Sequence, residues 1–187
     1  MTETIKIPLF PLGLVLLPGM ELPLHIFEAR YRLMISECVA DMTPFGIVQF
    51  DGQAIHSVGC MARITEVIEA YDDGRMDIMT RGEGRFVVRE LIQEKAYMEA
   101  RVIFFDDNME AEDHDTTEVV QRAMDLIEAA SDGDAGLSAS AVTADMNPKQ
   151  LSFAIAAMEG FSPAERQGLL EMVSPAEIPA DRISLKH

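Results

Sequence analysis

The segment that most constrains the fold is an apolar stretch near the N-terminus that four prolines interrupt. It spans residues 7–31 and reads IPLFPLGLVLLPGMELPLHIFEARY, with prolines at positions 8, 11, 18 and 23. A membrane-spanning helix needs about 20 apolar residues in helical conformation. Each proline removes a backbone donor and disfavours helix at the residue before it, and the longest uninterrupted apolar run is Leu14–Leu17. The start MTETIK also lacks the basic character of a secretory signal. We therefore expect the stretch to belong to the fold, and we expect no membrane association.

The charge balance limits the classes of partner. Among 187 residues, 32 are acidic and 15 are basic, so the net charge is −17. Nucleic-acid affinity comes largely from Lys and Arg neutralising phosphates, and anionic lipid surfaces also attract basic segments. The balance therefore disfavours both, and it favours neutral, basic or unfolded protein surfaces as partners. The two cysteines, Cys38 and Cys60, fall on apolar faces of a predicted helix and a predicted strand. We expect them to be buried reduced thiols, which favours a cytoplasmic location.

Residues 44–106 alternate apolar and polar positions, as antiparallel strands do. Turn signals separate the apolar runs at Asp51-Gly52, at Asp72-Asp73-Gly74 and at Gly82-Glu83-Gly84. The pattern predicts a small barrel or sandwich, to which the opening stretch adds strands Ile5–Phe10 and Glu21–Ile26 with its prolines at edges and bends. One helix interrupts the strands, because apolar residues from Tyr31 to Met42 follow helical spacing.

The chain changes character near residue 106. An acidic connector, Asp106–Glu118, precedes a helical stripe between Val119 and Ala130. Helix-start signals then occur three times, at Asn147-Pro148, Ser162-Pro163 and Ser174-Pro175, each with Gln or Glu at the third helical position. We therefore predict a β-rich domain over residues 1–110 and a helical subdomain over residues 111–187, in the α+β class.

No catalytic motif is recognisable. The chain lacks a phosphate-binding loop, a Gly-x-Ser-x-Gly elbow, a His-Glu-x-x-His motif and a Cys-x-x-Cys pair. Its four histidines are far apart in sequence, and the adjacent carboxylates Asp72 and Asp73 lie in a predicted turn. We expect no catalytic residues, no metal and no cofactor, and a binding role rather than catalysis. A small enzyme remains a third alternative.

An ordered series of motifs runs along the β-rich part of the chain. It begins with PLFPLGLVLLPGMELPLHIFEARYRLMI at residues 8–35 and continues with FGIV at 45–48, VGCMARI at 58–64, DGRMDI at 73–78 and GRFVV at 84–88. Together these motifs resemble the Lon-protease N-terminal domain family, a PUA-like substrate-binding domain. The resemblance implies a PUA-like six-stranded β-barrel with one packed helix, followed by a small C-terminal helical bundle. In full-length Lon proteases, ATPase and Ser-Lys peptidase modules follow this domain. The chain resembles stand-alone members without them, so the resemblance does not imply proteolytic activity.

The resemblance also implies a role in engaging protein or peptide segments through exposed apolar surface. The motif positions that become candidate partner-binding residues are Phe10, Pro11, Leu12, Leu14, His25, Phe27, Glu28, Arg30 and Tyr31. Their alternative is structural: Phe27 and Tyr31 would pin the helix to the barrel, and Glu28 and Arg30 would form a local ion pair. We expect the exposed apolar side chains within Pro11–Gly19. The hypothesis is a non-catalytic module, monomeric or weakly dimeric, that binds apolar or unfolded segments. The alternative is an RNA-binding PUA-like domain, which the net charge disfavours.

Overall fold

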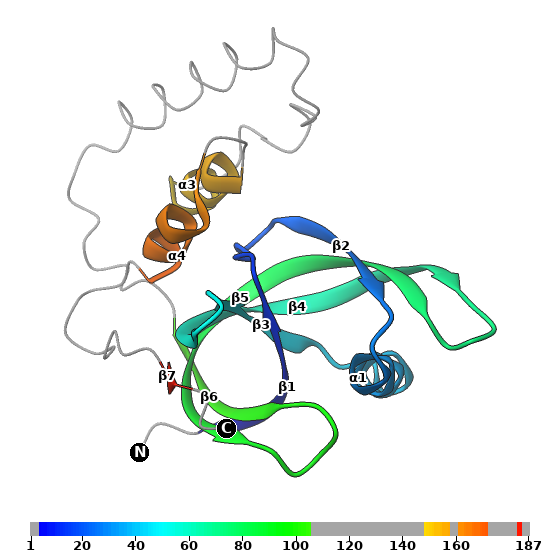
Figure 1. Cartoon of the computed structure of the whole chain (residues 1–187). Coiled ribbons are helices and arrows are strands. Elements are labelled where there is room, and N and C mark those ends of the chain that lie inside the picture. Colours follow the sequence, from blue (N-terminus) through cyan, green and yellow to red (C-terminus); the bar gives the residue numbers. More distant parts are fainter. Residues whose placement is uncertain (1–3, 106–147, 158–160, 172–182, 185–187) are drawn as a thin grey trace, which may run out of the picture.

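A computed structural model describes residues 4–105, 148–157, 161–171 and 183–184 (Figure 1). Its strands and helices in chain order are β1 Ile5–Leu12, β2 Glu21–Ile26, α1 Ala29–Asp41, β3 Phe45–Phe50, β4 Ala54–Ala70, β5 Met76–Ile92, β6 Glu99–Phe105, α3 Pro148–Ala157, α4 Pro163–Glu171 and β7 Ile183–Ser184. The predicted boundary near residue 110, the helical stripe from 119 to 130 and the third helix start at Ser174 lie outside the described residues.

The strands form one mixed sheet that closes on itself. The order is β2-β5-β6-β1-β3-β4-β7, and an additional β4–β5 pairing closes a ring of β1, β3, β4, β5 and β6. The β1–β3 pair is parallel, from Leu9↔Gly46 to Leu12↔Gln49, whereas β1 and β6 are antiparallel. Strand β2 lies outside this ring and pairs with the first part of β5, from Glu21↔Arg81 to Ile26↔Met76. The six predicted strands are therefore confirmed, with β2 attached to the ring rather than inserted in it.

Two apolar cores lie on opposite sides of the ring wall. One is formed only by ring strands, including Leu9, Phe86 and Val102, and fills the interior. The other lies on the outer surface, where α1 buries Tyr31, Met34, Ile35 and Cys38. Residues 54–62 of β4 supply both cores, so their side chains are buried on both faces with His56 as the partly exposed member. This explains why Met61, which breaks the predicted alternation, is only 3% exposed.

The linker between β1 and β2 differs from the prediction. We expected the exposed apolar side chains of the opening stretch within Pro11–Gly19, but Val15, Leu16 and Leu17 in that range are almost completely buried in the outer core. The linker lies against β5, because Gly19 N donates to the Gly82 carbonyl at 2.8 Å and Gly82 N donates to the Met20 carbonyl at 2.9 Å. The stretch therefore contributes to the core rather than to an exposed loop.

A second difference concerns Gly82-Glu83-Gly84, which we predicted as a turn. These residues lie within β5, a continuous strand of 17 residues. The other two predicted turns are confirmed, since Gly52 and Gly74 adopt positive φ values of 94° and 85° between strands. Gly82 marks a close approach of another backbone segment instead of a reversal, since it shares hydrogen bonds with Gly19 and Met20.

The two described helices of the C-terminal part pack beside the barrel. Helix α4 begins with the predicted capping box, in which Glu165 N donates to Ser162 Oγ at 3.3 Å and Ser162 N donates to Glu165 Oε2 at 2.8 Å. Buried Arg85 donates to the Leu170 carbonyl at 3.1 Å, and its guanidinium lies 5.4 Å from the Phe153 ring centre. The remainder of the predicted helical bundle lies outside the described residues.

Candidate functional site

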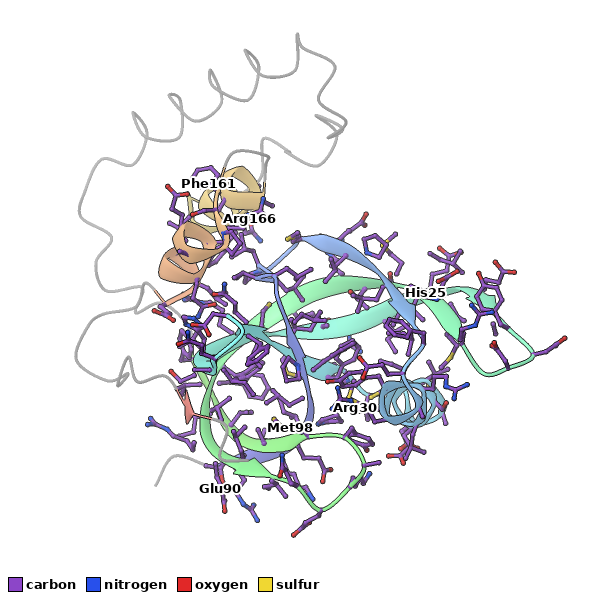
Figure 2. All side chains as sticks on the ribbon, in the orientation of Figure 1. His25, Arg30, Glu90, Met98, Phe161 and Arg166 are labelled. Atoms are coloured by element: carbon purple, nitrogen blue, oxygen red, sulfur yellow. The ribbon has the colours of Figure 1, made fainter. Side chains whose placement is uncertain are left out.

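A groove of about 690 Å³ opens where β1, the end of β2, the start of α1 and the β5–β6 hairpin meet. Figure 2 labels three residues around it: His25 on β2, Arg30 at the start of α1 and Met98 just before β6. The sequence brings these segments together because a short linker joins β1 to β2, and α1 begins three residues after β2 ends. The groove is therefore built largely from the proline-rich stretch.

Aromatic side chains form the floor. The rings of Phe10 and Tyr31 stack with centroids 4.0 Å apart, and Phe45 lies behind Phe10 at 6.2 Å. The Arg30 guanidinium covers the Tyr31 ring at 4.7 Å, a favourable cation–π contact. Burial raises the pKa of the Tyr31 phenol, so this side chain stays neutral at physiological pH. The floor of the groove is therefore an apolar aromatic surface with the Arg30 guanidinium at one edge.

Phe27 stands at the rim of the groove with 61% of its surface exposed. The ring of His25 stacks beside it, with centroids 5.9 Å apart. Its exposure contradicts the structural alternative that Phe27 pins the helix to the barrel. Tyr31 fits that alternative, because it is buried against Phe10. An exposed aromatic ring at the edge of an apolar groove is the kind of surface that partners cover.

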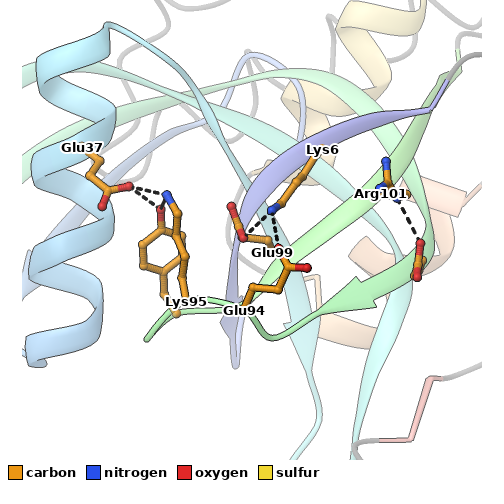
Figure 3. A network of polar contacts seen from close by, with 8 residues as sticks. Lys6, Glu37, Glu94, Lys95, Glu99 and Arg101 are labelled. Carbon is orange, nitrogen blue, oxygen red and sulfur yellow. Dashed lines mark hydrogen bonds and ion pairs between the residues drawn. The ribbon is translucent and has the colours of Figure 1, made fainter.

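A polar clasp holds the β5–β6 hairpin against α1 and forms one wall of the groove (Figure 3). Lys95 Nζ donates to Glu37 Oε2 at 2.7 Å, and the Tyr97 hydroxyl donates to the same oxygen at 2.5 Å. The hydrogen bond from Lys95, followed by that from Tyr97, lowers the pKa of Glu37. On the other side of the hairpin, Lys6 pairs with Glu94 at 3.1 Å and with Glu99 at 2.9 Å.

A second polar group lies at the β2 end of the groove. His25 Nδ1 is 2.5 Å from Asp77 Oδ1, and the Tyr71 hydroxyl donates to Asp77 Oδ2 at 2.6 Å. Hydrogen bonds from Tyr71 and then from His25 lower the pKa of Asp77. The hydrogen bond to Asp77 raises the pKa of Tyr71 to about 12. At neutral pH, Asp77 is therefore an ionised acceptor and Tyr71 a protonated donor.

Eight of the nine candidate residues line the groove: Phe10, Pro11, Leu12, His25, Phe27, Glu28, Arg30 and Tyr31. The ninth, Leu14, is partly buried against the outer core and does not line it. Glu28 and Arg30 form the expected local ion pair, with Arg30 Nη2 2.8 Å from Glu28 Oε2. The structure thus gathers the motif residues on one surface but assigns Leu14 to packing.

The sequence interpretation missed half of the lining residues, most of which are distant from the motif along the chain. The additional residues are Leu24, Ile26, Phe50, Gln93, Lys95, Ala96, Tyr97 and Met98. Leu24 and Ile26 lie within the motif and could have been inferred from strand alternation beside His25. Residues 93–98 carry no motif signal, and only the folded hairpin brings them to the groove.

Within the described ranges, no group of three or more His, Cys, Asp or Glu side chains is placed to hold a metal ion. No helix of that same part of the chain is long and apolar enough to cross a membrane. What the groove offers is an aromatic floor, an exposed aromatic rim and charges that are already paired. Such a surface suits the docking of apolar side chains.

Comparison with solved structures supports the fold. The chain resembles the crystal structure of a Lon N-terminal domain protein from Xanthomonas campestris with a TM-score of 0.67 and 21% identity, covering 91% of this chain and 92% of that one. It also resembles the N-terminal domain of a Mycobacterium avium complex Lon protease, with a TM-score of 0.50 and 19% identity over 89% of this chain and 96% of that one.

Comparison with known sequences extends the likeness. The chain is 29% identical to the Lon protease of Methylocella silvestris over 175 residues, which is 86% of this chain but 21% of that protein. It is 30% identical to Lon protease 2 of Myxococcus xanthus over 115 residues, 57% of this chain and 14% of that protein. The chain thus spans about a fifth or less of the length of these relatives. A sequence model of the substrate-binding domain of ATP-dependent protease La (LON) matches residues 6–178. The chain therefore belongs to the family of Lon substrate-binding domains.

Proposed function

We propose that this chain is a non-catalytic recognition module that binds apolar segments of unfolded polypeptide in the groove. Membership of the substrate-binding family supports a substrate-recognition role with protein substrates. The observation that carries the finer proposal is the groove itself, about 690 Å³ in volume, with its aromatic floor and with Phe27 61% exposed at its rim. Large apolar side chains of a partner would replace water on these rings, and burying one contributes about 1.5 to 3 kcal/mol.

The charges around the groove favour polypeptide over nucleic acid. Arg30 is bonded to Glu28 and Lys95 to Glu37, so the cations that line the groove are already neutralised. Phosphate recognition needs a surplus of such cations, whereas the chain carries a net charge of −17. These charges therefore favour polypeptide over RNA as the ligand of the groove.

The thiols support the non-catalytic part of the proposal. Burial raises the pKa of Cys38 to about 11 and that of Cys60 to about 12, and neither residue lines the groove. Both thiols therefore remain protonated and inaccessible at neutral pH, which disfavours a role as a nucleophile.

The test is fluorescence anisotropy of a labelled, unstructured peptide built from Leu, Phe and Ser, titrated with the full chain. Phe27→Ser should weaken binding about tenfold to a hundredfold, the loss expected from one buried aromatic side chain. The matched control is Phe104→Ser, because Phe104 is also an exposed phenylalanine, at 43%, but lies on β6 outside the groove lining.

Phe104→Ser should leave the affinity within about twofold of the parent chain, as expected of a substitution outside the contact surface. Equal affinities for the parent chain and Phe27→Ser, or equal losses in the two variants, would show that the groove is not the binding surface. Urea unfolding of each variant verifies that both retain the parent fold.

A further inference from the structure

His25 lies at the β2 end of the groove, where it is both held by neighbouring side chains and exposed. Its side chain is 47% exposed and lines the groove between two rings, stacked on Phe27 at 5.9 Å and edge-on to Tyr71 at 6.2 Å. One ring nitrogen, Nδ1, is engaged by Asp77 at 2.5 Å. The ring is therefore held in one orientation while part of it remains accessible to a bound partner.

The hydrogen bonds determine which nitrogen carries the proton. Asp77 is ionised at neutral pH, so its carboxylate carries no proton and can only accept hydrogen bonds. Its second oxygen accepts one from the Tyr71 hydroxyl at 2.6 Å. Nδ1 of His25 must therefore donate to Asp77. A neutral imidazole has a single N–H group, so the other nitrogen, Nε2, is left as an unprotonated acceptor.

The charged groups around His25 make this corner of the groove electronegative. The Asp77 carboxylate on β5 is hydrogen-bonded by the Tyr71 hydroxyl and by His25 Nδ1. Tyr71 also contacts Glu69 of β4. The nearby cation Arg75 lies 5.0 Å above the Tyr71 ring and is paired with Asp73 at 2.7 Å.

The other charged groups at this end of the groove are Glu28 and Arg30, which neutralise one another at 2.8 Å. Asp77 itself does not line the groove, but its negative charge lies 2.5 Å behind the ring, at Nδ1, and attracts a cation placed at Nε2. A cationic N–H donor complements both features, because it donates to Nε2 and is attracted by the carboxylate.

We propose that His25, oriented by Asp77, selects apolar polypeptide segments that carry a lysine, whose ammonium group donates to His25 Nε2. This inference rests on the proposed function and names the chemistry of its substrates. Protonation of His25 converts Nε2 into a donor and adds a positive charge beside Asp77. The preference for lysine therefore requires the neutral imidazole and is lost when the imidazole is protonated.

The experiment compares three labelled peptides that are identical except at one position, which holds Lys, norleucine or Glu. Each is titrated with the full chain by anisotropy at about pH 8 and at about pH 5.5, on either side of the range in which histidine titrates. At the higher pH, the Lys peptide should bind about threefold to tenfold more tightly than the norleucine peptide, as expected of one partly exposed charge-assisted hydrogen bond. At the lower pH this difference should vanish.

Two variants locate the effect. His25→Phe keeps a ring beside Phe27 but removes both nitrogens, so it should bind the Lys and norleucine peptides equally at either pH. The matched control is His56→Gln, because His56 lies on β4 near Asp51 and Glu171, outside the groove lining. This control should keep the preference for lysine and its dependence on pH.

Nitrogen-15 NMR of the imidazole tests the tautomer without any peptide. The spectrum of the full chain near pH 8 should show His25 protonated at Nδ1 and unprotonated at Nε2, with the assignment supplied by the His25→Phe spectrum. The opposite tautomer would overturn the inference.

The outcomes separate this inference from the proposed function. Equal affinities for the three peptides, with all of them binding and Phe27→Ser weakening all of them, overturn the role of His25 and leave the groove as the binding site. Absence of binding by every peptide overturns both. A preference for lysine that survives in His25→Phe assigns the selectivity elsewhere and also overturns the inference.

Discussion

Gly82 tests the close contact between the β1–β2 linker and β5. A Cβ atom added there would overlap with the carbonyl oxygen of Leu17, and it would lie 2.9 Å from the carbonyl carbon and 3.3 Å from Cys60 Sγ. The first two atoms belong to the backbone and cannot move by a simple change of rotamer. Gly82→Ala should therefore push the linker away from the strand.

The magnitude follows from the contacts that this movement breaks. Two backbone hydrogen bonds hold the linker at this point, from Gly19 N to the Gly82 carbonyl and from Gly82 N to the Met20 carbonyl, and each contributes about 1 kcal/mol. Overpacking beside the fully buried Leu17 costs about 1 to 3 kcal/mol more. We expect Gly82→Ala to lower the free energy of unfolding by about 3 to 5 kcal/mol.

Urea unfolding followed by far-UV circular dichroism measures this loss, since the chain contains no tryptophan. The matched control is Gly84→Ala on the same strand, where an added Cβ would meet only Phe104 Cδ1 at an ordinary 3.7 Å. This control should stay within about 1 kcal/mol of the parent chain, as is usual for substitutions without a clash. Equal losses in the two variants would refute the argument from backbone overlap.

Two further predictions concern titratable groups. Burial raises the pKa values of Cys38 and Cys60 to about 11 and about 12. Neither thiol should therefore react with iodoacetamide in the native chain near pH 8, whereas both should react in urea. Rapid labelling of the native chain, counted by mass spectrometry, would contradict this. The hydrogen bond from Tyr71, followed by that from His25, lowers the pKa of Asp77, so its stabilising contribution is present above its ordinary value of 3.8 and is lost as the pH falls through the lowered value. Asp77→Asn should therefore destabilise the chain more at pH 7 than at a pH below the lowered pKa of Asp77, and an equal loss at both would contradict the assigned contacts.

Strand and helix positions could be predicted well where one face of an element is buried. The bounds predicted for β2, Glu21–Ile26, agree with the structure, in which Leu22 and Ile26 are buried and Pro23 and His25 are exposed. The start of α4 was predictable because its capping box is local, with Ser162 and Glu165 satisfying one another. Such signals depend on neighbours within a few residues and need no knowledge of the tertiary fold.

Prediction failed where distant segments cover both faces of an element. Strand alternation alone would place Arg81, Arg85 and Arg89 on one solvated face, but Arg85 is 2% exposed because α4 and Phe153 lie over it. The candidate site shows the same contrast between residues that are close in sequence and residues that only the fold brings together. Phe10, Phe27 and Tyr31 lie on one continuous stretch, whereas the wall formed by Lys95 and Tyr97 depends on a hairpin that folds back on α1.

The prolines of the opening stretch also indicate how the groove would hold a peptide. Among the described residues, β2 pairs only with β5, and β1 beyond Leu9 pairs only with β3. Pro11 lines the groove and Pro23 lies on β2 next to the lining residue Leu24, and neither proline has a backbone N–H to donate to a peptide. A peptide could therefore form few ladder hydrogen bonds, and side-chain burial should dominate its affinity.

This reasoning predicts that backbone donors of the peptide matter little. An unstructured Leu-, Phe- and Ser-containing peptide with N-methyl groups on alternate residues should keep its affinity within about threefold, less than the loss of one typical hydrogen bond would cause. Replacing its Leu and Phe residues with Ser should abolish binding in the same anisotropy assay. If N-methylation instead removes binding while the side chains are intact, the peptide adds to a strand edge, and the prolines of β1 and β2 do not block it.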